Sequence, residues 1–213
     1  PPPPPVVSRY ATITADGITV DGNFTWKDIT GVLYPRSTAT GGAIATSLFN
    51  SKVAAWPLPS AAVIDCIYHV PHDYLPGSDV FLHLHWGHQG TAISGTFRVR
   101  ADISIASRTD LNASVMSDTV TQDITISPLT LTNAPRWGVR IDEIQASTPG
   151  GSSTMIDTNS ITVDSLIVVR YTVVTIPSIS GSASSNRPFI LAADLHMQSN
   201  VIGTKNKDPN FYA

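Results

Sequence analysis

Several features that would direct a chain toward particular classes of protein are scarce in this sequence. It has one cysteine, Cys66, in 213 residues, so an intramolecular disulfide framework is excluded. Charged residues make up only 14% of the chain and the net charge is -3, which leaves no basic surplus for binding a nucleic-acid backbone. We therefore expect a fold held by an apolar core, with no nucleic-acid partner.

Long apolar segments are missing as well. No apolar run approaches the roughly 20 residues that cross a bilayer as a helix. No stretch near the first residue combines basic residues with a long apolar segment, as a secretory signal does. The sequence thus predicts no export signal and no membrane partner. Cys66 itself lies in the apolar run AAVIDCIYHV, where a small buried side chain is expected.

The residues that are abundant favour β-structure. Ser, Thr, Asn and Gly accompany many Val and Ile, a composition typical of pleated sheet and turns. Period-two alternation is sustained in residues 97–105, where one predicted face carries Phe97, Val99, Ala101, Ile103 and Ile105. Strand-like segments separated by Gly- and Ser-rich turns recur up to residue 199. The chain is therefore predicted to be all-β, a jelly roll or β-sandwich of about eight antiparallel strands with extended N- and C-terminal arms.

The pattern divides the chain into three parts. Residues 1–60 are expected to form an extended N-terminal arm, opening on five prolines, and wrapping loops or short strands. Residues 61–200 are expected to form the sandwich, and residues 201–213 a C-terminal docking tail. The candidate partner-binding residues on the two arms are Pro1, Pro5, Tyr10, Lys205, Lys207, Phe211 and Tyr212. Three tryptophans, Trp26, Trp56 and Trp137, are further candidates for interface anchors or for the core.

Five of the six histidines lie in HVPHDYLPGSDVFLHLHWGHQG, residues 69–90. Alternation places His83 and His85 on one face of a strand, about 7 Å apart. Such a pair binds a transition metal where further ligands converge from neighbouring strands. His69 and His72 flank Pro71 in a predicted turn, where imidazoles are expected to tie the loop down.

Two interpretations of His83 and His85 stay open. Their spacing from Gly77, Gln89 and Gly95 resembles the first motif of cupins, which are jelly rolls, and His196 echoes the second motif. That resemblance implies a metal-binding protein using His83, His85, Gln89 and His196, although Gln89 stands where the family has a glutamate.

The other interpretation makes the imidazoles hydrogen-bonding struts. A neutral imidazole donates through one nitrogen and accepts through the other, so it can join a strand to a neighbouring carboxylate. The candidate partners are Asp65, Asp73, Asp79 and Asp194. On this interpretation the chain has no metal centre, no cofactor and no catalytic residue. The sequence also lacks the G-x-S-x-G, C-x-x-C and H-E-x-x-H motifs of common enzymes.

Four segments resemble, in this order, virion structural proteins of tailed bacteriophages: FTWKDITG, HVPHDYLPGSDVFLHLHW, WGVRIDEI and ADLHMQSNVIGTKNKDPNFY. The resemblance implies a non-enzymatic virion component that is assembled in the host cytoplasm. A compact β-domain with extended ends favours a head decoration (cement) protein on the capsid exterior. Such a protein would bind the major capsid protein and associate with itself, as a homotrimer. The alternative is a tail, fibre or carbohydrate-binding component of the virion.

Overall fold

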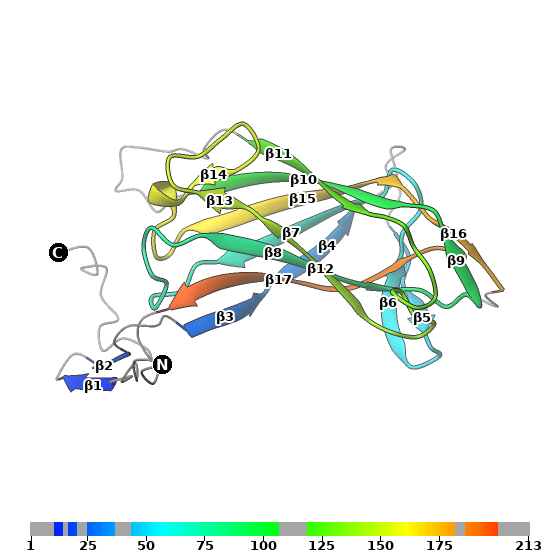
Figure 1. Ribbon diagram of the computed structural model, residues 1–213, viewed down its shortest axis with the longest axis horizontal. Helices are drawn as coiled ribbons and strands as arrows, with labels where there is room; N and C mark the ends of the chain where they lie inside the picture. Colours follow the sequence, from blue (N-terminus) through cyan, green and yellow to red (C-terminus); the bar gives the residue numbers. More distant parts are fainter. Residues whose placement is uncertain are drawn as a thin grey trace, which may run out of the picture.

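The computed structural model describes residues 11–14, 17–20, 25–36, 44–106, 119–181 and 186–199. These residues form two large antiparallel sheets that pack over a shared apolar core (Figure 1). The all-β sandwich expected from the sequence is confirmed. Within the described ranges, no helix is long and apolar enough to cross a membrane.

One sheet has five strands within the described residues, in the order β11-β10-β15-β7-β4. Their bounds are Val120–Ile126 (β11), Phe97–Ala106 (β10), Leu166–Thr175 (β15), Val63–His69 (β7) and Val32–Arg36 (β4). The two longest strands, β10 and β15, pair with each other at the centre. Strands β11 and β4 are therefore the edges of this sheet.

The other sheet has six strands within the described residues, in the order β12-β8-β17-β6-β5, with β3 also pairing with β17. Their bounds are Arg140–Gln145 (β12), Val80–Gly87 (β8), Phe189–Ser199 (β17), Val53–Pro57 (β6), Ser47–Phe49 (β5) and Thr25–Thr30 (β3). Strand β17 is long enough to pair with β8 along one side and with both β6 and β3 along the other. It is the central strand of the sheet.

Eight of the described strands follow the order of a jelly roll. In chain order, strands one to eight are β3, β7, β8, β10, β11, β12, β15 and β17. With this numbering, strands β3-β17-β8-β12 of the six-stranded sheet have the order 1-8-3-6, and strands β7-β15-β10-β11 of the five-stranded sheet have the order 2-7-4-5. This is the strand order of a jelly roll, with its two Greek keys. The first strand, β3, comes from residues 1–60, the stretch expected to supply the arm and wrapping strands. The boundaries expected at residues 60 and 200 stay predictions.

Smaller elements surround this framework. Three two-stranded pairs are described: β1 (Ala11–Thr14) with β2 (Gly17–Val20), β9 (Ala92–Ser94) with β16 (Ser178–Ser180), and β13 (Ser147–Thr148) with β14 (Ile156–Asp157). One short 3-10 helix, η1, spans Thr158–Ser160 in the described chain. None of these pairs belongs to the two large sheets.

The core follows the alternation seen in the sequence. The predicted inner face of β10 is confirmed, because its five apolar side chains, from Phe97 to Ile105, are each at most 1% exposed. From the other sheet, Leu82, Leu84 and Trp86 of β8 are equally buried. Burial of apolar surface stabilises a fold by about 25 cal/mol per Å². Packing between β10 and β8 therefore joins the two layers.

The chain passes from one sheet to the other at Gly31, the single residue between β3 and β4. The Gly31 N–H donates to the carbonyl of Ala193 on β17, at 2.9 Å. A Cβ atom at this position would lie 2.3 Å from Cys66 Sγ and 2.5 Å from Tyr68 Cε1. Since real side chains do not approach so closely, only glycine fits this crossing.

Cys66 should be unreactive in the folded protein. Its side chain is fully buried and burial raises the pKa of the thiol to about 11. Compared with an ordinary thiol of pKa about 8.5, it would hold about 200-fold less thiolate near pH 8. Alkylation by iodoacetamide, followed by mass spectrometry, should be at least about 100-fold slower in buffer than in denaturant. Equal rates in the two conditions would contradict the burial of Cys66.

Candidate functional site

A cluster of histidines and carboxylates lies on the outer face of the six-stranded sheet. In β8 the inward side chains are Leu82, Leu84 and Trp86, which turns His83 and His85 outward together. The sequence prediction that these two imidazoles share one face is confirmed. Their ring centroids are 6.3 Å apart.

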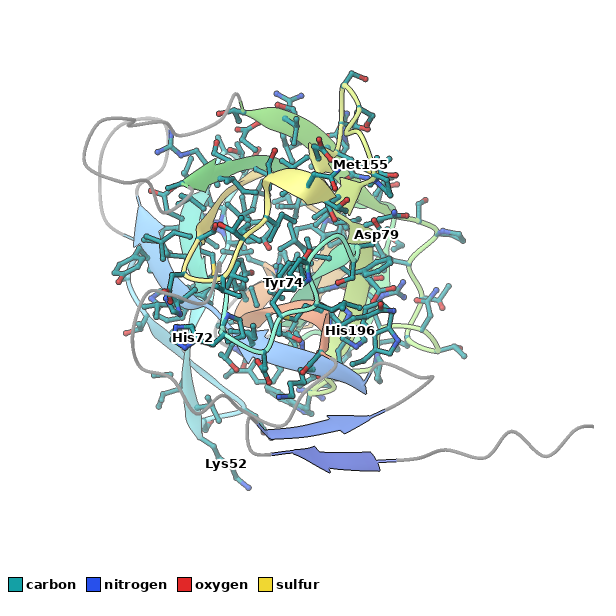
Figure 2. The ribbon with its side chains drawn as sticks, turned by 90° about the vertical axis from the view of Figure 1, so that its left-hand side faces the viewer. Lys52, His72, Tyr74, Asp79, Met155 and His196 are labelled. Carbon is teal, nitrogen blue, oxygen red and sulfur yellow. The ribbon has the colours of Figure 1, made fainter. Side chains whose placement is uncertain are left out.

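Pairing of four strands brings carboxylates to these histidines. Asp194 of β17 and Glu143 of β12 lie opposite His83 on either side. His196, two residues after Asp194, lies opposite Asp28 of β3, and Figure 2 shows it beside that strand. We call these six residues the outer-face cluster: Asp28, His83, His85, Glu143, Asp194 and His196.

His83 is the centre of the outer-face cluster. Its Nδ1 is 3.0 Å from Asp194 Oδ2, and its Nε2 is 2.6 Å from Glu143 Oε2. Burial opposes protonation of His83, but the bond to Glu143 and the charge of Asp194 outweigh it and raise the pKa of the imidazole. The bond from His83 in turn lowers the pKa of Glu143. His83 thus joins three strands, its own β8, β17 through Asp194 and β12 through Glu143.

The remaining groups of the cluster are less well satisfied. Nε2 of His85 contacts Oδ1 of Asp194, yet neither atom makes a hydrogen bond among the described residues, and both atoms are buried. Asp194 is only 6% exposed. Nitrogen and oxygen atoms converge within 4.8 Å of one another in two groups: His83, His85 and Asp194, and Asp28, His83 and His196. Histidine nitrogens with a carboxylate oxygen are a donor set for a transition-metal ion.

Aromatic side chains border the cluster on its β3 side. The ring of Trp26 lies 4.7 Å from the ring of His196 and 5.5 Å from that of Phe81. Trp26 is 45% exposed and Trp137 is 36% exposed, whereas Trp56 packs against the core. Of the three predicted candidates, Trp26 and Trp137 are therefore at the surface.

The other histidine-region residues have structural partners. Gln89 is buried beyond the end of β8, and its amide donates to the Leu48 carbonyl at 3.3 Å. The carboxylate that contacts both His83 and His85 is Asp194. His69 and His72 both face Asp164, with His72 Nε2 at 2.7 Å, which ties their turn to the loop before β15. Asp164 was not among the partners expected from the sequence, because it lies about ninety positions along the chain.

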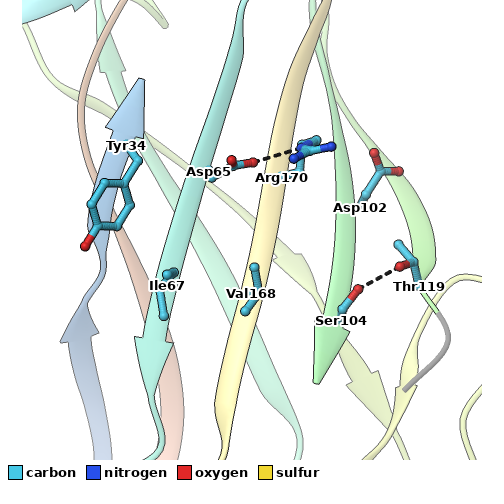
Figure 3. A pocket seen from close by; sticks show the side chains of 8 residues that line it. All are labelled: Tyr34, Asp65, Ile67, Asp102, Ser104, Thr119, Val168 and Arg170. Atoms are coloured by element: carbon cyan, nitrogen blue, oxygen red, sulfur yellow. Dashed lines mark hydrogen bonds and ion pairs between the residues drawn. The ribbon is translucent and has the colours of Figure 1, made fainter. Parts of the chain in front are cut away.

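A second candidate is a shallow depression of 590 Å³ on the outer face of the five-stranded sheet (Figure 3). Arg170 donates to Asp65 at 2.8 Å, and the hydroxyls of Ser104 and Thr119 lie 2.7 Å apart. The Asp102 carboxylate accepts from Thr121 at 2.8 Å, beside the depression. Its polar groups bind one another across neighbouring strands. We interpret them as stabilising the sheet.

Exposed apolar side chains lie on several outer strands, among them Leu48 on β5 and Val53 on β6, and two edges carry a pair each. Val32 and Tyr34 on β4 are 56% and 48% exposed. At the edge of the other sheet, Ile141 on β12 and Val139 just before it are each 55% exposed. Edge strands with exposed apolar groups are sites of association between chains.

The arm residues expected to bind a partner lie outside the described residues: Pro1, Pro5, Tyr10, Lys205, Lys207, Phe211 and Tyr212. Their role stays a prediction. The same holds for the expected absence of a cofactor and for the expected partners.

No known protein family and no curated protein matches the chain. Among solved structures, the enzymatically active domain of tailspike protein 4 of bacteriophage CBA120 shows a weak likeness. The TM-score is 0.28 and the sequence identity 9%, over 84% of this chain. The chain spans 19% of the length of that protein. A likeness at this level carries no argument about function.

Proposed function

We propose that this chain is a non-enzymatic structural protein of a phage virion, which binds the capsid shell as a cement protein. The observation that carries the proposal is the pair of apolar edge strands, β4 and β12, on a jelly roll. The sequence resemblance to tailed-phage virion proteins, which spans most of the chain, supports the same class. The function is therefore adhesion between protein surfaces.

The positions of the two edges suit a ring of subunits. Strands β4 and β11 are the two opposite edges of the five-stranded sheet. Strand β12 of the other sheet contacts β11, so β4 and β12 lie on opposite sides of the sandwich. An interface that joins one side of a subunit to the opposite side of the next generates a closed ring when the rotation closes. The proposed homotrimer is one such ring. Many copies on one shell then act multivalently, so a modest contact at each site suffices.

Charge placed on both apolar edges should weaken assembly. The double variant Tyr34→Lys/Ile141→Lys puts lysine where apolar anchors are exposed, and we expect at least about 10-fold weaker binding to capsid shells that lack the protein. Co-sedimentation with such shells measures the effect. The matched control is the double variant Thr121→Lys/Thr125→Lys, which adds the same charge to exposed polar positions of the edge strand β11. Unchanged binding by the double variant, or equal loss in the control, would reject the edges as contact surfaces.

The position in the particle is tested by imaging. Density for the jelly roll on the head shell supports the cement function, whereas density on the tail would make the chain a tail or fibre component. Deletion of residues 1–9 or 206–213 separately tests the arms as clasps. Full binding by both shortened chains would remove the arms from the proposal.

A further inference from the structure

The outer-face cluster contains a three-residue set that is built like a metal site. The donor atoms of His83, His85 and Asp194 lie within 4.8 Å of one another. Nitrogen and oxygen ligands lie about 2.0–2.2 Å from a tetrahedral zinc ion, which puts neighbouring ligands roughly 3.3 Å apart. The 3.0 Å between His83 Nδ1 and Asp194 Oδ2 is close to this spacing.

The strongest support comes from polar atoms without hydrogen bonds. Asp194 Oδ1 and His85 Nε2 are buried and make no hydrogen bond among the described residues, although they contact each other. Each of these two buried atoms has only the other as its polar contact in the described chain, which is fewer partners than a buried carboxylate oxygen commonly has. One cation in contact with both atoms would satisfy them together. Asp194 is more than nine-tenths buried, so bulk water does not serve this purpose.

Glu143 occupies the place of a supporting carboxylate. A histidine that binds a metal through one nitrogen commonly donates its other N–H to a carboxylate, which fixes the tautomer of the ring. Glu143 Oε2 is 2.6 Å from His83 Nε2. When His83 carries its proton on Nε2 and donates it to Glu143, its Nδ1 is available to an ion.

The burial of the ligands distinguishes this set from the neighbouring one. The side chains of His83, His85 and Asp194 are 13%, 23% and 9% exposed. In the other convergent group, Asp28 is 62% exposed. Both groups use His83, so one ion is expected, at the more buried position. The imidazole ligands favour zinc, nickel, cobalt or copper over calcium and magnesium, which prefer oxygen.

We infer that His83, His85 and Asp194 bind one divalent transition-metal ion on the outer face of the six-stranded sheet, with Glu143 orienting His83. The ion links strands β8 and β17 directly, and β12 through Glu143. An ion that binds the folded chain alone raises its stability by mass action. The three ligands lie on neither apolar edge strand, and Glu143 shares β12 with Ile141 of the proposed capsid contact. Metal binding is measured on the isolated chain, so its failure is distinguishable from a failure of capsid binding.

The test uses the full chain, stripped with a chelator and then titrated with Zn²⁺ by calorimetry and thermal unfolding. We expect one ion per chain and a higher Tm. His85→Ala and Asp194→Asn should weaken binding by more than about 100-fold, and Glu143→Gln by about 10- to 100-fold. The control His69→Ala removes an exposed imidazole outside both convergent groups and should bind like the parent chain.

Folding of each variant is checked by its unfolding curve without metal. Co²⁺ provides an independent measurement, since its visible absorption reports nitrogen and oxygen ligation in a specific geometry. A folded parent chain that binds less than a stoichiometric amount of Zn²⁺ overturns the site. So does an equal loss of binding in His69→Ala and His85→Ala, which would indicate nonspecific binding by surface histidines.

Discussion

Replacement of Trp86 by alanine should lower the free energy of unfolding by about 3–5 kcal/mol. Trp86 is fully buried, and its ring lies 4.9 Å from that of Phe97 on the opposite sheet. Its Nε1–H donates to Asp142 on β12 at 2.7 Å. The variant would lose the packing between layers and leave a cavity. It would also remove one of the two hydrogen bonds to Asp142 Oδ2, which keeps its bond from Arg140 at 2.9 Å.

Urea unfolding followed by far-UV circular dichroism measures this loss, since tryptophan fluorescence changes with the substitution itself. The variant Trp86→Phe keeps part of the packing but lacks the hydrogen bond. Its free energy of unfolding should lie between those of the parent chain and Trp86→Ala. The matched control is Trp26→Ala, which removes a 45% exposed ring and should cost about 1 kcal/mol or less. Equal losses at the two tryptophans would contradict the assignment of Trp86 to the core.

Gly31→Ala should be the second most damaging change, at about 3 kcal/mol. The added methyl would lie 2.3 Å from Cys66 Sγ and 2.5 Å from the Tyr68 ring. Both neighbours are fully buried and lack room to move. Relief would require a shift of the crossing between the two sheets, which is held by the bond from Gly31 to Ala193.

A double-mutant cycle tests the steric cause. Cys66→Ala removes the sulfur atom, so Gly31→Ala should cost less in that background than in the parent chain. Thr30→Ala, at the adjacent exposed position, is the control and should change stability by no more than about 0.5 kcal/mol. If Gly31→Ala were also this mild, the close packing at the crossing would be wrong. Chemical denaturation monitored by circular dichroism serves for the parent chain and all four variants.

Local periodicity was sufficient to predict much of the fold. The inner face of β10 and the shared face of His83 and His85 both follow from period-two alternation, which depends only on neighbouring residues. His69 and His72 were correctly expected to fasten a loop, through Asp164, although His69 ends strand β7 and does not lie in the turn. The jelly-roll order was one of two expected outcomes, because sheet order depends on pairing between distant strands.

The composition of the outer-face cluster could not be predicted in the same way. Asp194 lies 111 positions from His83, and Glu143 lies 60 positions away. Their meeting is fixed by strand register, and a shift of one residue would turn each to the other face. Asp194 appeared only as one of four candidate partners, and Glu143 had no signal in the sequence. Gln89 had the expected spacing but lies beyond the end of β8, where the chain has turned toward β5.

The central place of β17 has a consequence for biosynthesis. The five-stranded sheet is complete once residue 175 has left the ribosome, because β15 is its last strand along the chain. Strand β3, by contrast, pairs with β17 alone among the described strands, and so waits until residues 194–199 emerge. Until then the inner face of β8 has only part of its sheet around it. During synthesis the six-stranded sheet is therefore incomplete after the strands of the five-stranded sheet have emerged. A chaperone bound at this stage would cover the apolar inner face of β8.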